Sequence, residues 1–222
     1  MSKDTKIDVF FLIDISGSMT GEPIDSLCNV VIDILKTLSC DPRNLGRIRL
    51  SINTYNSKFY ENHKLELVED LLFIFSSLGN AYGPTHSGEA IEQILLKIKE
   101  TTDQYENNEH VYKKPLLIHI TDGLPSDIHF FNHIIVDLKR QKINTIGCGI
   151  GENIDLTTLK LFSDKVFYVE NNNGKSIIEF SKLLSSIILF YLFSDDNNLD
   201  ALEVLNPTKP NNPNLSARIK IL

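Results

Sequence analysis

The segment Ile7-Asp-Val-Phe-Phe-Leu-Ile-Asp-Ile-Ser-Gly-Ser18 decides the fold of this chain. Residues 7–13 form an almost wholly apolar run of branched and aromatic side chains that stops at a polar turn. Such a short run is typical of a parallel strand buried on both faces, which delivers the residues after it to the loop at its carboxyl end. The side chains delivered here are one carboxylate and two hydroxyls at alternate positions, those of Asp14, Ser16 and Ser18.

These oxygen-bearing side chains predict a metal site. Carboxylate and hydroxyl oxygens are hard donors, which suit magnesium, calcium or manganese and suit zinc or copper poorly. A second apolar run, at residues 115–121, ends in Asp122, and a turn-rich loop places Thr85 just before a predicted helix. Ligands gather beyond the carboxyl ends of strands in an open parallel sheet. Each piece alone also fits a helix cap or an ordinary turn, and the specificity comes from the set. As a set, Asp14, Ser16, Ser18, Thr85 and Asp122 predict one divalent cation with a coordination position left for water or an incoming ligand.

Strand-like and helix-like segments alternate along the chain. Strands are predicted at residues 7–13, 47–55, 58–68, 115–121, 143–150 and 165–169, the third of them as an antiparallel edge strand. Helices are predicted at residues 22–39, 68–77, 87–105, 127–141, 156–162 and 176–193. This alternation indicates an α/β fold with a mainly parallel sheet and helices on both faces. Asp127 is expected to cap the helix that it opens, because its carboxylate can accept from the free amides of the first turn.

The composition limits the classes of function. The 222 residues carry a formal net charge of −7 and no basic run, which argues against a nucleic-acid partner. The longest apolar stretch, residues 183–193, contains two serines and is too short to span a bilayer. Three cysteines without close pairing favour a reducing compartment over a disulfide framework. Since residues 1–6 lead into a strand without a cleavable apolar segment, a cytoplasmic location is expected.

The composition changes near residue 194. We predict a domain at residues 1–193 and an Asn/Pro-rich tail at residues 194–222. Two alternatives stay open for this tail: a poorly ordered segment, or one that docks on the domain or on a partner. Its last apolar patch, residues 215–222, is long enough for one strand or one helix.

The metal set resembles that of a known family. Asp14-Ile-Ser-Gly-Ser18, with Thr85 and Thr121-Asp122-Gly123 downstream, looks like the metal-ion-dependent adhesion site of von Willebrand factor A (VWA) domains. The resemblance covers residues 6–193. The bacterial VWA proteins of tellurium-resistance (TerY-type) clusters carry segments similar to two in this chain. These segments are Gly83-Pro-Thr85 and Pro115-Leu-Leu-Ile-His-Ile-Thr-Asp-Gly-Leu-Pro-Ser-Asp127.

The resemblance implies a Rossmann-like, six-stranded sheet of order 3-2-1-4-5-6 with one antiparallel edge strand. It implies a Mg²⁺ or Mn²⁺ ion held by Ser16, Ser18 and Thr85, directly or through water, with Asp14 and Asp122 bonding the waters of the ion and orienting the hydroxyls. It also implies a non-enzymatic protein that binds a partner's acidic residue at the metal, in a stress-type module beside a protein kinase and a protein phosphatase. One departure is Gly83-Pro84 where many members carry two glycines; the proline is expected to bias Gly83 towards extended conformations.

Two competing functions are considered. A phosphohydrolase of similar fold attacks phosphate with the aspartate after the first strand, here Asp14, but such enzymes generally need a second aspartate two residues on, where this chain has Ser16. The other competitor is a structural or assembly role in which the tail, residues 194–222, engages another chain.

Overall fold

The computed structural model describes residues 5–105, 110–151, 154–169, 174–194, 199 and 219–221. Its strands are β1 (Thr5–Asp14), β2 (Ile48–Tyr55), β3 (Phe59–Leu67), β4 (Val111–Tyr112), β5 (Leu116–Thr121), β6 (Asn144–Ile150), β7 (Lys165–Val169) and β8 (Ile219–Ile221). Its helices are the short 3₁₀ turn η1 (Gly17–Met19), α1 (Glu22–Ser39), α2 (Val68–Ile74), α3 (Ser87–Thr102), α4 (Ile128–Arg140), α5 (Leu156–Phe162) and α6 (Gly174–Phe193).

The strands form one sheet of order β3-β2-β1-β5-β6-β7-β8, and β4 pairs with the start of β1. The strands β1, β2, β5, β6 and β7 are parallel, whereas β3 and β8 run antiparallel to β2 and β7. Without β4 and β8, the strands in chain order are arranged 3-2-1-4-5-6. The α/β fold class and the Rossmann-like order are therefore confirmed. Within the described residues, the sheet has eight strands instead of the expected six, and β8 gives it a second antiparallel edge strand. The strand β4 was not predicted, because two residues are too few to show a periodicity.

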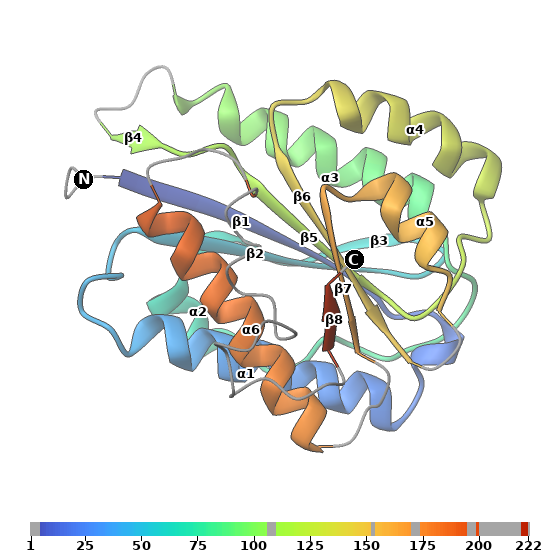
Figure 1. Ribbon diagram of the computed structural model, residues 1–222, viewed down its shortest axis with the longest axis horizontal. Helices are drawn as coiled ribbons and strands as arrows, with labels where there is room; N and C mark the ends of the chain where they lie inside the picture. The colour runs from blue at the N-terminus through green and yellow to red at the C-terminus, as the bar shows by residue number, and fades with distance from the viewer. Residues whose placement is uncertain are drawn as a thin grey trace.

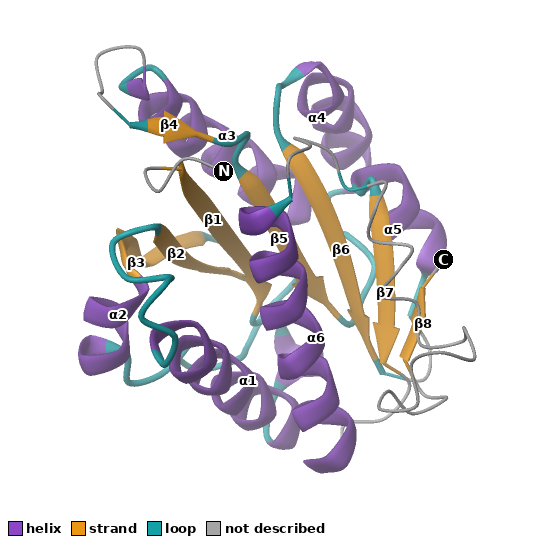
Figure 2. Ribbon diagram, turned by 60° about the vertical axis from the view of Figure 1, so that its left-hand side comes forward, coloured by secondary structure: helices purple, strands orange, loops and turns teal. Residues whose placement is uncertain are grey.

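Helices cover both faces of the sheet: α1, α2 and α6 lie on one face, and α3, α4 and α5 on the other (Figures 1 and 2). Alternate side chains of β1 belong to two different cores. Val9, Phe11 and Ile13 pack in the core under α1 and α6, whereas Phe10 and Leu12 pack in the core under α3 and α4. Burial on both faces explains why β1 is apolar at consecutive positions.

The apolar run in α6 is part of the core. Leu184, Ile187 and Ile188 are fully buried in the cluster that also contains the inner face of α1. No helix in the described ranges combines the length and the apolar character that crossing a membrane requires.

The segment predicted as a tail contributes a strand. Ile219–Ile221 pairs antiparallel with β7, so that the edge of the sheet beyond β7 is covered by β8 (Figure 2). Of the two alternatives for the apolar patch at residues 215–222, the structure has the strand. The remaining tail residues at 195–198, 200–218 and 222 lie outside the described residues.

A buried ion pair joins β1 to β2. Asp8 and Arg49 are partners in the parallel register, and the Arg49 guanidinium donates from Nε to Oδ1 at 2.7 Å and from Nη2 to Oδ2 at 2.6 Å. The Asp8 side chain is fully buried, and Tyr105 donates a further hydrogen bond to its carboxylate. Arg49 also lies over the ring of Tyr112, with 5.2 Å from Cζ to the ring centroid. Both carboxylate oxygens of Asp8 thus accept hydrogen bonds, from the Arg49 guanidinium and from Tyr105.

Candidate metal site

The loop after β1 gathers three of the predicted residues. Asp14 is the last residue of β1 and is fully buried, and its Oδ1 accepts a hydrogen bond of 2.7 Å from the backbone N–H of Ser16. The side-chain oxygens of Ser16 and Ser18 lie 3.2 Å apart. Ser16 is buried and Ser18, in η1, is exposed. The alternating oxygens therefore run from the interior to the surface.

The loop after β5 meets this first loop. Thr121 Oγ1 donates to Asp14 Oδ2 at 2.6 Å, and Ser18 Oγ donates to Asp122 Oδ1 at 2.8 Å. The parallel pairing of β1 with β5 explains the first of these contacts, because Ile13 pairs with Ile120 and the next residues of the two strands are Asp14 and Thr121. Asp14, Ser16, Ser18 and Asp122 thus lie in one hydrogen-bonded cluster.

The third loop, which carries Thr85, is bonded to both of the others. Gly17 N–H donates to Gly83 O at 2.9 Å, and Ser126 N–H, from the β5–α4 loop, donates to Thr85 O at 2.7 Å. Gly83 has a φ of +77°, a conformation that glycine adopts readily. The prediction of an extended conformation before Pro84, which requires a negative φ, is therefore wrong. Thr85 is buried, and its hydrogen bonds within the described part of the chain are made by its backbone N–H and C=O and not by Oγ1. This hydroxyl is therefore available to a ligand.

No cationic side chain of the described residues is paired with the two carboxylates of the cluster. Burial raises the pKa of Asp14 to about 6; the nearby charge of Asp122 adds a smaller upward effect to this net value, and the hydrogen bonds from Thr121 and Ser16 oppose it. Burial likewise raises the pKa of Asp122. A divalent cation among these oxygens would favour the ionised form of both groups.

The donor set fits a hard cation. No group of three or more His, Cys, Asp or Glu side chains able to hold a metal occurs among the described residues, so a metal site here needs hydroxyl ligands as well as the two carboxylates. Carboxylate, hydroxyl and water oxygens suit Mg²⁺ and Mn²⁺, and magnesium commonly keeps several waters beside one or two carboxylates. The residues that would hold the ion or its waters are Asp14, Ser16, Ser18, Thr85 and Asp122.

Asp127 does not cap the helix that it opens, contrary to the sequence-based prediction. It occupies the N-cap position of α4, yet its carboxylate makes no capping bond there. It accepts instead from the backbone N–H groups of Gly88, at 3.2 Å, and Glu89, at 3.0 Å, in the first turn of α3. These bonds could not be predicted from the sequence, because capping patterns are local and these bonds join the starts of two helices far apart in the chain.

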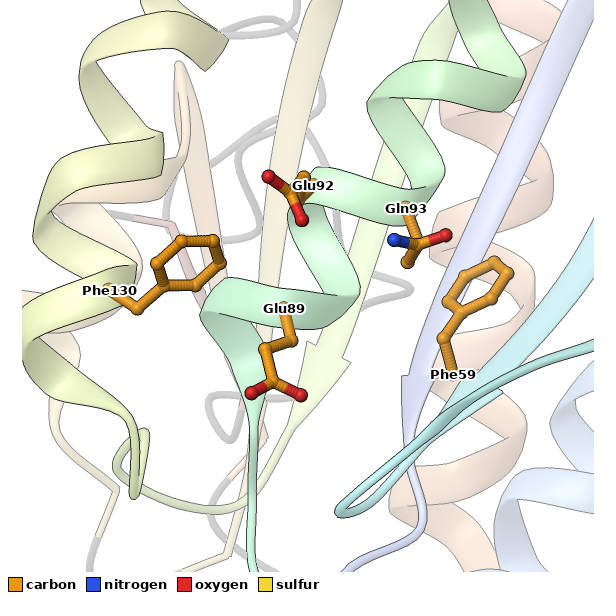
Figure 3. A pocket seen from close by; sticks show the side chains of 5 residues that line it. All are labelled: Phe59, Glu89, Glu92, Gln93 and Phe130. Carbon is orange, nitrogen blue, oxygen red and sulfur yellow. The ribbon is translucent and has the colours of Figure 1, made fainter.

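A groove of about 310 Å³ lies beside the Thr85 loop. It is lined by Phe59, Glu89, Glu92, Gln93 and Phe130, and Figure 3 shows the two phenylalanine rings on either side of the start of α3. His86, next to Thr85, faces Glu89 with 3.4 Å between Nδ1 and Oε2. This groove is therefore acidic and partly aromatic.

A buried polar network lies beneath the site. The hydroxyl of Tyr55, at the end of β2, is 2.7 Å from His119 Nε2 and 3.0 Å from the Oγ of Ser87, the first residue of α3. The ring of His119 also packs edge-on against Phe162, with 4.8 Å between the ring centroids. The network joins β2, β5 and α3 below the loops that carry the oxygen ligands.

Replacing His119 with glutamine is expected to make folding less sensitive to acid. Burial lowers the pKa of His119 from 6.5 to about 3, so the folded protein keeps the ring neutral while the unfolded chain takes up a proton. The stability due to the neutral ring is complete above pH 6.5 and is lost, at about 1.4 kcal/mol per pH unit, as the pH falls from 6.5 towards 3. Urea unfolding at a series of pH values measures this slope.

The control for this experiment is His129→Gln, which removes an exposed imidazole from α4. His129→Gln should keep the acid slope of the parent, and His119→Gln should have a shallower one. Identical slopes for His119→Gln and the parent would contradict the assignment of acid sensitivity to this ring.

Comparison with known proteins identifies relatives of the chain. A family model described as the von Willebrand factor type A domain matches residues 8–182. The chain is 26% identical over 157 residues to the thrombospondin-related anonymous protein of Plasmodium berghei (strain Anka), which covers 68% of this chain and 25% of that protein. It is 26% identical over 169 residues to sporozoite surface protein 2 of Plasmodium yoelii yoelii, and the match covers 72% of this chain and 20% of that protein. The chain thus spans a quarter or less of the length of these relatives.

Solved structures show the same fold. The manganese-loaded TRAP protein of Plasmodium vivax is 20% identical with a TM-score of 0.54, over 82% of this chain and 74% of that one. Proximal thread matrix protein 1 of the mussel byssus has a zinc-occupied metal-ion-dependent adhesion site (MIDAS) motif. It is 18% identical with a TM-score of 0.60, and the match covers 82% of this chain and 46% of that one. Both of these neighbours hold a divalent metal.

Proposed function

Because this chain belongs to the von Willebrand factor type A domain family, we propose that it binds a partner protein through a divalent cation held at the carboxyl ends of β1 and β5. The observation that carries the proposal is the continuous cluster in which Ser18 joins Ser16 to Asp122 and Thr121 joins β5 to Asp14. This cluster brings oxygens from two loops together around two carboxylates, and no cationic side chain in the described ranges of the chain is hydrogen-bonded to either carboxylate. The manganese-loaded and zinc-occupied structures of similar fold support the cation.

The proposed ion is Mg²⁺ or Mn²⁺, at Asp14, Ser16, Ser18, Thr85 and Asp122. It would supply an electrophilic centre that accepts a carboxylate from the partner, a charge-assisted contact at the middle of the interface. Ser18 is exposed, so the site opens to the surface where a partner can reach it. The proposed partner therefore presents an aspartate or glutamate to the metal.

The cellular role proposed is that of an adaptor in a bacterial tellurium-resistance or stress-type signalling module, with a protein kinase and a protein phosphatase as partners. The resemblance of Gly83-Pro-Thr85 and of residues 115–127 to TerY-type proteins supports it. The proposed location is the cytoplasm, where the free thiols of Cys28, Cys40 and Cys148 would stay reduced. Residues 1–193 form the proposed binding domain, and the appendage at residues 194–222 adds β8 to its sheet.

The geometry favours binding over phosphoryl transfer. A nucleophilic aspartate has to reach the phosphorus atom, but Asp14 is fully buried and both of its carboxylate oxygens accept hydrogen bonds, from Ser16 N–H and Thr121 Oγ1. Ser16 also stands where the general acid of such an enzyme is expected. The phosphohydrolase is therefore the weaker candidate.

Ser16→Ala is expected to lower the affinity for Mn²⁺ by about 10- to 100-fold and to prevent metal-dependent capture of the partner. Calorimetry measures the first effect. The second is measured by recovering partners from a lysate with the parent protein in Mg²⁺, with the parent in EDTA, and with the variant in Mg²⁺. The matched control is Ser181→Ala, which also removes a buried serine hydroxyl, but one that lies in α6. The proposal fails if the same proteins are recovered in equal amounts under all conditions.

A further inference from the structure

The β5–α4 loop contacts the Thr85 loop at two consecutive residues, Ser126 and Asp127, neither of which belongs to the predicted metal set. Ser126 bonds the backbone of Thr85 on both sides: its N–H donates to Thr85 O at 2.7 Å, and its Oγ accepts from Thr85 N–H at 3.1 Å. The reciprocal pair fixes the orientation of both peptide groups of Thr85. Residue 85 is thus tied through its main chain, which leaves its hydroxyl for a ligand.

Asp127 holds the helix that follows. Its two carboxylate oxygens accept from the N–H groups of Gly88 and Glu89, which belong to the first turn of α3 and have no partner within the helix. The negative charge also lies at the positive end of the α3 dipole. The start of α3 is therefore fastened to the start of α4.

Gly88 permits this close approach. A Cβ atom at residue 88 would lie 2.5 Å from the backbone N of Phe131 and 2.8 Å from Asp127 Oδ2, and neither separation is possible for a real side chain. The contact with Phe131 is to backbone, which cannot rotate away. A glycine at this position is thus required for α3 and α4 to meet.

From these contacts we propose that Ser126 and Asp127 are positioning residues that hold the Thr85 hydroxyl at the metal, an inference that rests on the metal site of the proposed function. Thr85 is held between two bonded points, since Gly83 O accepts from Gly17 N–H on one side and Asp127 binds Gly88 and Glu89 on the other. Asp122 and the two positioning residues share one short loop. A displacement of that loop moves Asp122 and Thr85 together, so the two ligands act as a unit.

The test is a double-mutant cycle on the affinity for Mn²⁺, measured by calorimetry with Asp127→Ala, Thr85→Ala and the double variant. Asp127→Ala is expected to weaken Mn²⁺ binding about 10- to 100-fold, as loss of a group that orients a ligand does. If Asp127 acts through Thr85, the double variant binds no more weakly than Thr85→Ala. Losses that add in full, or an unchanged affinity in Asp127→Ala, overturn the proposal.

The matched control is Asp155→Ala. Asp155 caps α5 by accepting from Thr157 N–H and Thr158 N–H, so its loss also removes a helix cap but does not touch the Thr85 loop. Asp155→Ala should keep the Mn²⁺ affinity of the parent. If Asp127→Ala does not fold, Ser126→Ala and Asp127→Asn replace it, since each removes only part of the contact.

Hydrogen exchange gives a second readout that needs no metal. The amides of Gly88 and Glu89 should exchange faster in Asp127→Ala than in the parent, and those of Thr157 and Thr158 should not. An absence of Mn²⁺ binding by the parent would refute the proposed function and this inference together. Mn²⁺ binding that needs Ser16 but not Asp127 would refute only this inference.

Discussion

Asp14→Asn is expected to abolish the increase in melting temperature that Mg²⁺ or Mn²⁺ gives the parent, and to stabilise the metal-free protein at neutral pH. Ligand that binds only the folded state contributes about 2.7 kcal/mol at a concentration of 100 times the Kd, and the variant loses this contribution. Asparagine keeps the hydrogen-bonding shape of the site, because its carbonyl can accept from Ser16 N–H and its amide can donate to Thr121 Oγ1. The effect is therefore one of charge.

The sign of the second effect follows from the pKa of Asp14, which burial raises from 3.8 to about 6. A carboxyl group with a raised pKa in the folded state favours folding when it is protonated, so its contribution declines as the pH rises from 3.8 to about 6 and stays low above that value. The difference corresponds to about 3 kcal/mol, an order-of-magnitude figure. Asp14→Asn removes this cost above pH 6 when no metal is present.

Thermal unfolding with EDTA and with excess Mg²⁺ measures both effects. The matched control is Asp25→Asn, which makes the same change of charge at an exposed position on α1 and should respond to Mg²⁺ as the parent does. An Asp14→Asn variant with the full metal-induced increase would show that this carboxylate takes no part in holding the ion.

Asp8→Ala is expected to lower the free energy of unfolding by about 3–5 kcal/mol, because removing one partner of a buried ion pair leaves the other charge without compensation. The Asp8 carboxylate is fully buried and accepts two bonds from Arg49 and one from Tyr105. Since the Arg49 side chain is 27% exposed and can recover some hydration, the lower end of this range is the better expectation. Urea unfolding at neutral pH measures the loss.

The same chain offers a matched pair at the surface. Arg43 binds Asp41 through Nε and Nη2, as Arg49 binds Asp8, but the Arg43 side chain is 76% exposed. Water compensates the groups of an exposed pair, so Asp41→Ala should leave the stability almost unchanged. Equal losses in Asp8→Ala and Asp41→Ala would mean that burial does not decide the strength of this pair.

Much of the fold could be predicted from the sequence because the central strands are apolar on both faces and end at polar loops. Where strands and helices alternate, parallel strands are joined by crossover connections. Because these connections are almost always right-handed, only a few strand orders are possible for the sheet. The positions of β4 and β8 could not be predicted in this way. β4 has two residues, and β8 lies far along the chain from its partner β7, with only a short apolar patch to indicate it.

The residues of the candidate site that directly follow an apolar strand could be predicted from the sequence. Asp14 and Asp122 follow apolar runs, and the register of β1 with β5 then brings them together. The bonds of Thr121 to Asp14 and of Ser126 to Thr85 were not predicted, because a hydroxyl in a turn has many local uses and only the folded chain shows which group it bonds. Asp127 was assigned to the wrong helix for a related reason: an aspartate at a helix start satisfies the local capping rule, whereas its actual partners belong to α3.

The place of β1 in the sheet has a consequence for the kinetics of folding. Val9 pairs with Leu50 on one side and with Leu116 on the other, so the middle of the sheet cannot close until segments far apart along the chain have met. Closing loops of this length carries an entropic cost before the contacts are gained, which gives proteins of high contact order slow folding. Until then the apolar run of β1 is exposed, and during synthesis it would be a binding site for chaperones or a start for aggregation.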